Sequence, residues 1–375
     1  MEENKVDINS LIGFFLIGLI FIGWLYLNPP PPTPVVAQEE NSEVNVVNES
    51  PKQDLSEVLS QSNGNESQDS NLSFENSLSE KNELVRIDTE KFIIEFSTLG
   101  GQISSLELKG QLNYLGEPIN LIQSGNSTFN LDFTTKNGRI FNTKDQTFVS
   151  SINDRGSVKQ VSMKLLVSED VFIEYLYSVN LDDYIIDLDI NSRGFYNILD
   201  TNKRYNLNWE LTAFRNSKSI SYENRYSYLT YFHDDDKIDY LSISGDDEDD
   251  EENVNWISFK QHFFSSVIIA ENENPFKNVE FKSDDLVQDN NTDTLYTKKF
   301  ISKIPFDYSN SEFDNSLKFY FGPNQYSQLE TYDIGLEESV DFGWGIFGFI
   351  NKNVFVPLYR LSLIHISEPT RPTPI

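Results

Sequence analysis

The fold class follows from two stretches of alternating side chains, Val171-Phe-Ile-Glu-Tyr-Leu-Tyr-Ser-Val179 and Tyr184-Ile-Ile-Asp-Leu-Asp-Ile-Asn191. In both stretches every second residue is aromatic or aliphatic, and in the second one Asp and Asn fill most positions between them. Side chains of a β-strand point alternately to its two faces, so this period of two predicts strands with one buried and one solvated face. Such strands are typical of antiparallel sheets.

The same texture extends outward from about Leu84 to Phe321. Turn-forming pairs separate the alternating runs, namely Gly100-Gly101, Gly125-Asn126 and Asn137-Gly138. No ten-residue amphipathic helix interrupts this region. The sequence therefore predicts one large, mainly β domain of two packed antiparallel sheets, over residues 84–335.

Composition excludes several classes of function. Acidic residues outnumber basic residues 59 to 29, and the formal net charge is −30. A nucleic-acid partner is not expected, because a phosphate backbone is bound by neutralising it with Lys and Arg. The same balance argues against docking on anionic lipid through a basic face. The chain has no Cys, so disulfides, thiolate zinc sites and Cys nucleophiles are excluded, and no cofactor is expected.

The N-terminal residues predict a membrane anchor. An uncharged apolar run from Leu11 to Leu27 is long enough to cross a bilayer as a helix. The residues that we expect to anchor it are Leu11, Phe15, Leu19 and Trp24. A cleaved signal peptide is the alternative, but residues 1–7 carry three acids and only one Lys, whereas a signal peptide begins with basic residues. We therefore expect an uncleaved transmembrane helix within residues 1–27, and neither flank is basic enough for the positive-inside rule to give its orientation.

Residues 28–83 are predicted to be a disordered linker. The segment opens with Pro29–Pro32 and continues in Ser, Asn, Glu and Gln with few aliphatic residues. Such a composition buries too little apolar surface to offset the entropy of ordering.

The sequence after Gly322-Pro323 predicts helices. Asn324–Tyr332 is compatible with a short one. A second, amphipathic helix over residues 336–360 is indicated by apolar residues at helical spacing, Trp344, Phe347, Ile350, Val354 and Leu358. Lys352 and Arg360 interrupt any membrane-spanning run, so this helix should lie in a membrane interface, with a kink or an end at Pro357.

Three strings in this region resemble a known family. They are Phe321-Gly-Pro-Asn-Gln-Tyr326, Tyr332-Asp-Ile-Gly-Leu-Glu337 and Asp341-Phe-Gly-Trp-Gly-Ile-Phe-Gly348. Together they resemble the junction between the periplasmic domain and the membrane core of YidC-type membrane protein insertases (the YidC/Oxa/Alb family) of Gram-negative bacteria. Supporting resemblances lie at Asn9–Tyr26, Phe96–Lys109 and Phe259-Lys-Gln-His-Phe-Phe264.

This resemblance implies a β-supersandwich in the periplasm, a cytoplasmic N-terminus and a place in the inner membrane. It implies a role in inserting and folding inner-membrane proteins, alone or with the Sec translocon. The implied partners are the lipid bilayer, Sec translocon components and nascent membrane proteins, and no enzymatic chemistry is implied.

The family's working part is a bundle of five membrane helices with a functional Arg in a hydrophilic groove. Nothing in this sequence matches that bundle, and Arg360 does not match the groove Arg. We therefore expect an N-terminal fragment that is inactive alone. Residues 361–375 are Pro-rich and resemble translated sequencing-adapter sequence, so we expect that they are not native.

Two other functions stay open. The chain is alternatively a membrane-tethered periplasmic binding or carbohydrate-active β-sandwich module, or a plain anchored structural domain. The junction strings favour the insertase interpretation, because a free-standing module has no use for a Gly-rich amphipathic helix after its last strand.

Acidic residues and histidines are the candidate chemical groups. Asp246–Glu252 and Asp234–Asp236 suit calcium by ligand type, but they lack the Gly or Asn spacing of a cation loop, so solvated loops are expected. His233 and His262 are possible acid–base groups, although a structural role is the usual outcome in strand-like sequence. His365 lies in the tail and is discounted.

Aromatic residues offer a candidate groove. Trp209, Trp256 and the Tyr222–Tyr231 cluster would line a peptide or glycan groove or, more commonly in sandwiches, belong to the core. Gly100-Gly101 should be a turn and not a phosphate cradle, because no helix follows it.

Overall fold

The computed structural model describes residues 82–358 except 124, 169, 235, 272, 273 and 344. The chain divides into two units, residues 1–69 and 70–375, and only the second contains described residues. The expected anchor with Leu11, Phe15, Leu19 and Trp24 lies outside the described residues. So do nearly all of the linker, Trp344 and the tail 361–375, and these expectations remain predictions.

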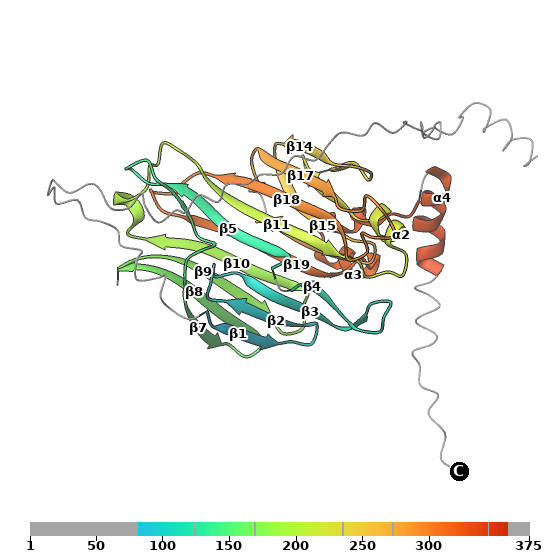
Figure 1. Ribbon diagram of the computed structural model, residues 1–375, viewed down its shortest axis with the longest axis horizontal. Coiled ribbons are helices and arrows are strands. Elements are labelled where there is room, and N and C mark those ends of the chain that lie inside the picture. Colours follow the sequence, from blue (N-terminus) through green and yellow to red (C-terminus); the bar gives the residue numbers. More distant parts are fainter. Residues whose placement is uncertain are drawn as a thin grey trace, which may run out of the picture. The chain divides into compact units, whose positions relative to one another are not determined.

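The second unit contains three antiparallel sheets (Figure 1). A four-stranded sheet has the order β1-β2-β3-β4. Its strands are β1 (Leu84–Asp88), β2 (Phe92–Ser97), β3 (Ile103–Leu112) and β4 (Pro118–Ile122).

A nine-stranded sheet has the order β13-β12-β15-β16-β19-β10-β9-β8-β7. Its strands are β7 (Val149–Asp154), β8 (Val158–Ser168), β9 (Val171–Asn180), β10 (Ile185–Arg193), β12 (Tyr228–His233), β13 (Lys237–Tyr240), β15 (Val254–Lys260), β16 (Phe264–Ala270) and β19 (Asp314–Pro323).

A six-stranded sheet has the order β14-β17-β18-β11-β5-β6. Its strands are β5 (Ser127–Thr134), β6 (Ile140–Asn142), β11 (Tyr205–Phe214), β14 (Asp247–Glu251), β17 (Val279–Asp285) and β18 (Tyr296–Phe306).

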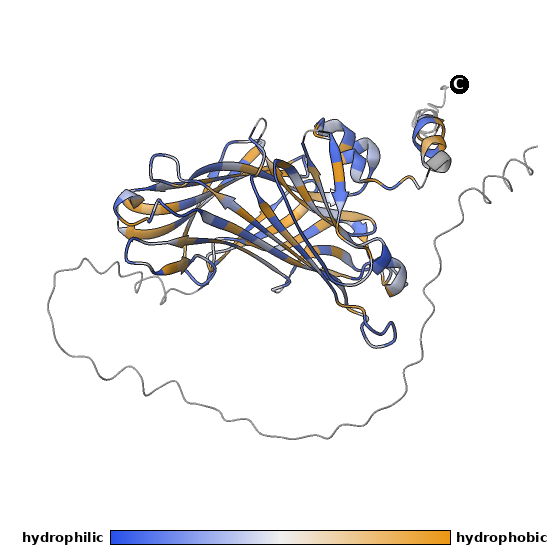
Figure 2. Cartoon of the chain, turned by 90° about the horizontal axis from the view of Figure 1, so that it is seen from above, coloured by the Kyte–Doolittle hydropathy of each residue, from blue (hydrophilic) through white to orange (hydrophobic). Residues whose placement is uncertain are grey.

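The alternating stretches form the neighbouring strands β9 and β10. Tyr177 pairs with Leu188, and Tyr175 pairs with Ile190, in antiparallel register. All four side chains are buried, whereas Asp187, which precedes Leu188, is exposed and Asp189 is half-buried. The mainly β, antiparallel class that this alternation predicts is confirmed, and Figure 2 shows hydrophobic and hydrophilic residues along the strands of the sandwich.

Both smaller sheets pack on the same face of the nine-stranded sheet. Trp209 of β11 stacks on Phe259 of β15 with 4.2 Å between ring centroids. Phe96 of β2 lies 4.7 Å from Tyr177 of β9. The expected two layers are therefore present, but one layer consists of two separate sheets. Contacts between aromatic rings of this kind add to the burial of apolar area in holding layers together.

Short helical segments cover part of the other face of the nine-stranded sheet. They are α3 (Tyr326–Leu329), η3 (Glu330–Tyr332) and η4 (Leu336–Ser339), so the short helix expected near Asn324–Tyr332 is present. Leu329 and Leu336 pack with Trp256 and Tyr320 in a second apolar cluster. The indole Nε1 of Trp256 donates a hydrogen bond to the carbonyl of Ile334 over 3.0 Å.

The last helix is α4 (Gly345–Ile350), which continues as a π-helical turn, η5 (Asn351–Phe355), and as α-helix to Leu358. The wide turn lies directly before Pro357, which cannot donate an amide hydrogen bond. Because the helix continues to Leu358, Pro357 does not end it within the described residues. Among those residues, no helix combines the length and the apolarity that crossing a membrane requires.

Candidate functional site

A pocket of about 650 Å³ opens between the β12–β13 pair and the segment that leads into α4. Its aromatic wall includes Tyr226, Tyr228 and Tyr240. The antiparallel register of β12 and β13 places Tyr240 opposite Thr230, beside Tyr228, and the two tyrosine rings lie 5.5 Å apart. Asp341 and Lys352 bring charge to the opposite side of the pocket.

A buried lysine lies behind this aromatic wall. Lys260 ends β15 and is paired in register with Tyr228, and only 3% of its surface is exposed. Its Nζ donates a hydrogen bond to the Tyr228 hydroxyl over 2.5 Å and lies 4.3 Å from the centroid of that ring. Burial lowers the pKa of Lys260 to about 8, although the nearby Asp341 carboxylate acts in the opposite direction.

Polar and aromatic contacts hold η5 near α3. Lys352 Nζ forms an ion pair with Glu338 over 2.7 Å and lies 5.9 Å from the centroid of the Tyr326 ring. The Tyr326 ring meets Phe342 edge-on at 5.1 Å, and Asn351 Nδ2 donates to the Phe342 carbonyl over 2.8 Å. The hydrogen bond to Glu338 raises the pKa of Lys352, so its positive charge is stable at neutral pH. Lys352 is thus held toward the short helical segments that follow the last strand.

Apolar side chains are exposed along the same helix, and one of them, Phe349, also lines the pocket. Val354 and Leu358 of the predicted stripe are exposed, and Ile350 is half-buried. Phe347 lies in α4, but its side chain is outside the description, as is Trp344. Phe349 and Phe355 are also exposed, and we did not predict them. Phe355 lies within the π-turn, whose residues depart from regular α-helical spacing.

His262 lies between aromatic rings and a serine. Its ring stacks on Tyr226 at 4.9 Å, and its Nδ1 lies 3.3 Å from Ser217 Oγ. Burial, helped by the positive charge of Lys260, lowers the pKa of His262. Ser217 Oγ also donates to the buried carboxylate of Glu223. The serine therefore lies between the histidine and the acid, whereas a nucleophilic triad requires the histidine in the middle.

His233 has a different environment at the end of β12. It is buried, and its Nε2 lies 3.4 Å from Asp239, while its Nδ1 lies 3.7 Å from Asp234 and 3.5 Å from Glu251. These carboxylates belong to β13, the turn before it and β14. His233 therefore connects the nine-stranded and six-stranded sheets at this corner, which is a structural role.

The acidic run was expected to be a solvated loop, and this expectation is wrong for most of it. Asp247–Glu251 forms β14, the edge strand of the six-stranded sheet. Glu248 pairs in register with Lys282 of β17. Opposite charges across a strand pair stabilise it, and the remaining acids protect a sheet edge from pairing with another chain.

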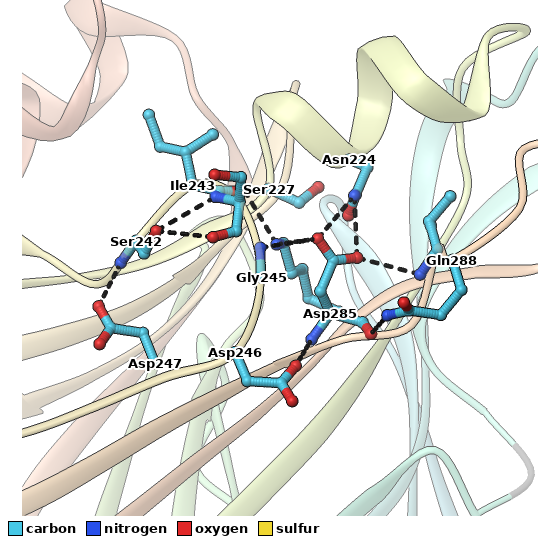
Figure 3. Close-up of polar contacts among 12 residues, drawn as sticks. Asn224, Ser227, Ser242, Ile243, Gly245, Asp246, Asp247, Asp285 and Gln288 are labelled. Carbon is cyan, nitrogen blue, oxygen red and sulfur yellow. Dashed lines mark hydrogen bonds and ion pairs between the residues drawn. The ribbon is translucent and has the colours of Figure 1, made fainter. Parts of the chain in front are cut away.

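Polar contacts hold Asp246, the residue directly before β14, in place (Figure 3). Asp246 accepts a hydrogen bond from the backbone N–H of Asp285 over 2.8 Å. Asp285 in turn accepts from Asn224 Nδ2 at 3.0 Å and from the buried Lys298 Nζ at 2.8 Å. Burial would raise the pKa of Asp285, but the hydrogen bonds from Lys298 and its neighbours outweigh it and the pKa is lowered. Within the part of the chain that the structure describes, no group of three or more His, Cys, Asp or Glu is arranged to hold a metal ion.

The tryptophans and tyrosines proposed for a groove separate into two groups. Trp209 and Trp256 are buried in the core, as is Tyr231. Tyr226 and Tyr228 line the pocket instead. Sequence alternation alone does not separate these groups, because the outcome depends on which sheet face the C-terminal segment covers.

A family model of the YidC periplasmic domain matches residues 84–357, which include the sandwich and the helix α4–η5. The chain belongs to this family. The junction strings near Phe321, Tyr332 and Asp341 all lie inside the match, and the resemblance that they carried is confirmed.

Curated relatives agree with the family. The chain is 31% identical over 367 residues to the membrane protein insertase YidC of Azobacteroides pseudotrichonymphae genomovar. CFP2, with 95% of this chain and 57% of the relative covered. It is 30% identical over 371 residues to the membrane protein insertase YidC of Bacteroides fragilis (strain YCH46), with 94% and 58% covered. The chain thus spans less than two thirds of the length of these YidC relatives.

Solved structures with a similar arrangement are distant from this YidC domain. A galactose mutarotase-like protein from Lactobacillus casei is 8% identical, with a TM-score of 0.40 over 64% of this chain and 100% of that one. An α-N-acetylgalactosaminidase from Bifidobacterium bifidum is 11% identical, with a TM-score of 0.44 over 68% and 39%.

Proposed function

We propose that this chain is the periplasmic part of a membrane protein insertase in the inner membrane. One observation carries the proposal, namely that the YidC periplasmic-domain match covers both the sandwich and the helix after it. Relatives at about 30% identity are named membrane protein insertases, which supports the same role.

In this proposal the sandwich stands in the periplasm and α4–η5 lies in the membrane interface. The exposed Val354, Phe355 and Leu358 enter the lipid, while Lys352 stays paired with Glu338 on the protein side. A helix with one apolar face and one polar face binds at a bilayer surface in this way. The partners that we propose are the lipid bilayer, Sec translocon components and nascent membrane proteins, and no chemical catalysis is proposed.

The insertion step itself is proposed to need more than this chain. The chain covers 57% and 58% of two insertase relatives, so more than a third of each relative has no counterpart in the alignment. We propose that the sandwich and α4–η5 support a membrane-embedded core that this remaining sequence supplies.

Complementation of an insertase-depleted strain tests the proposal. The chain alone is compared with a chimera in which it replaces the matched part of the Bacteroides fragilis relative. We expect the chimera to restore growth and insertion of a reporter membrane protein, and the chain alone to restore neither. Rescue by the chain alone, or failure of a well-expressed chimera, would contradict the proposal.

A further inference from the structure

A second set of exposed apolar side chains lies at the same end of the sandwich as α4. Leu112 and Leu115 at the tip of the β3–β4 hairpin are each 63% exposed. Phe263 in the β15–β16 turn is 54% exposed, and Tyr222 on α2 (Ile220–Arg225) is 46% exposed. Figure 1 shows the β3–β4 hairpin, α2, α3 and α4 at one end of the sandwich. We call these four side chains, with the loop 214–219 between them, the end surface.

Direct contacts join the hairpin tip to the loop before α2. The backbone N–H of Tyr114 donates to the carbonyl of Asn216 over 3.1 Å. The guanidinium of Arg215 lies 4.6 Å from the centroid of the Tyr114 ring. Asn216 Nδ2, which is buried, donates to Gln261 Oε1 over 2.8 Å. The hairpin tip is therefore held against the body of the domain.

Contacts continue from there to α2 and to the β15–β16 turn. The His262 ring lies 3.7 Å from the ring of Phe263 and 5.0 Å from that of Tyr222. The Phe263 carbonyl accepts a hydrogen bond from the N–H of Asn324 over 2.8 Å, two residues before α3 begins. The end surface is thus a connected part of the domain, and it adjoins the segment that positions η5.

The exposed charges of residues 215–225, which include most of the loop of the end surface, are opposite in sign to the net charge of the chain, although the exposed Glu117 lies two residues from Leu115 in the hairpin. Arg215, Lys218 and Arg225 lie within eleven residues of one another, and Glu223 is the only acid between them. Glu223 is fully buried, and this burial raises its pKa. Exposed charge in this segment is therefore positive, although the whole chain carries −30.

We propose that the end surface docks on a bilayer that contains anionic phospholipid, beside α4–η5. This inference rests on the proposed function, in which α4–η5 brings this end of the domain to the membrane. Leu112, Leu115 and Phe263 would enter the lipid surface, Tyr222 would lie at the level of the headgroups, and Lys218 and Arg225 would pair with phosphates.

The form of the surface favours lipid over a protein partner. Its most exposed apolar side chains lie at turn tips, and basic and aromatic residues lie between them. Small apolar projections among basic residues suit a soft, negatively charged surface, whereas stable protein interfaces need a continuous close-packed area.

Site-specific labelling of the full chain tests the proposal, because the sequence has no Cys that would compete. An environment-sensitive fluorophore is placed on Leu115→Cys, on Leu358→Cys in the helix and on Ile152→Cys of the edge strand β7. Each protein is reconstituted into vesicles with or without anionic phospholipid, and quenching by spin-labelled lipid is measured. Ile152, 55% exposed, is the matched control away from the end surface.

We expect lipid to quench the labels at 115 and 358 but not at 152. The double variant Lys218→Glu/Arg225→Glu should weaken docking of the end surface by at least roughly twentyfold, since each basic residue near an anionic surface strengthens binding by about fivefold. Quenching at 358 without quenching at 115 would overturn this inference and leave the proposed function intact. Quenching at neither position would overturn both. A label at 115 that is protected from a water-soluble quencher but is not quenched by lipid would show that protein covers the end surface. That outcome would also overturn the inference.

Discussion

The buried Lys260 and the half-buried Tyr228 form a pair in which one lysine contacts both the hydroxyl and the ring of one tyrosine. The Nζ atom donates to the hydroxyl over 2.5 Å and lies 4.3 Å from the ring centroid. Within the described residues, no ion pair to the Lys260 Nζ is present, and the Asp341 carboxylate acts on it only from a distance. An ammonium so placed is costly to keep charged, because neither a phenol nor a ring replaces the water that it loses.

The free energy of unfolding should depend on pH in a way that reflects the lowered pKa of Lys260. Its pKa in the folded protein is about 8, below the ordinary 10.5, so between these values the unfolded chain binds more protons than the folded protein. Stability therefore rises with pH in this window. Lys260→Met should abolish this contribution, about 2 kcal/mol between pH 8 and pH 10 relative to the wild-type protein. Urea unfolding of both proteins at the two pH values measures this contribution. An equal change in the free energy of unfolding for the wild-type protein and the variant would contradict the lowered pKa of Lys260.

The buried ion pair between Lys298 and Asp285 should be sensitive to loss of one partner. Asp285→Asn leaves the Lys298 ammonium buried without a counter-charge, and we expect a loss of about 3–5 kcal/mol in the free energy of unfolding. The matched control is Asp284→Asn, because Asp284 pairs with the more exposed Lys282 over 2.8 Å. The control should cost less than about 1 kcal/mol. Similar losses of unfolding free energy in the two variants would show that burial of the ion pair does not determine its contribution to stability.

Two glycines in turns should differ in their tolerance of a methyl group. Both have positive φ, +64° at Gly101 and +81° at Gly138, so either Gly→Ala change adds about 1 kcal/mol of backbone strain. At Gly101 the new Cβ would also lie 2.9 Å from the buried Phe148 ring, whereas nothing lies within 4 Å at Gly138. Gly101→Ala should therefore cost about 1–3 kcal/mol more than Gly138→Ala in thermal or urea unfolding. Equal cost would mean that Phe148 moves freely.

The apolar side of α4–η5 should matter for membrane function and not for folding. Val354→Glu/Phe355→Glu places two charges where we propose lipid, so the chimera described above should lose most of its ability to restore growth. The sandwich should unfold at the same urea concentration, because both side chains are exposed. Leu166→Glu, at an exposed position on β8, is the control and should retain growth. Full activity of the double variant would contradict the interfacial role of the helix.

Much of the fold could be predicted from the sequence, because burial of one face of a strand produces an alternation of apolar and polar residues along it. The alternation in Val171–Val179 and Tyr184–Asn191 predicted β9 and β10, whose registered pairs are buried on the expected face. The acidic run Asp246–Glu252 shows no such alternation. Both faces of β14 are polar, and the strand exists because β17 offers a partner with Lys282 at the matching position.

The sequence by itself determined the antiparallel β class, the helical segments after the last strand and the family, since each is recorded in local spacing or in short ordered strings. Only the tertiary structure decided that two sheets share one face of the third, that Lys260 is buried against Tyr228, and that three basic residues join exposed leucines and aromatics at one end of an acidic chain. These features depend on contacts between residues roughly 30 to 100 positions apart, from the Lys260–Tyr228 hydrogen bond to the one between Tyr114 and Asn216. Periodicity describes one strand at a time and carries no information about which strands meet.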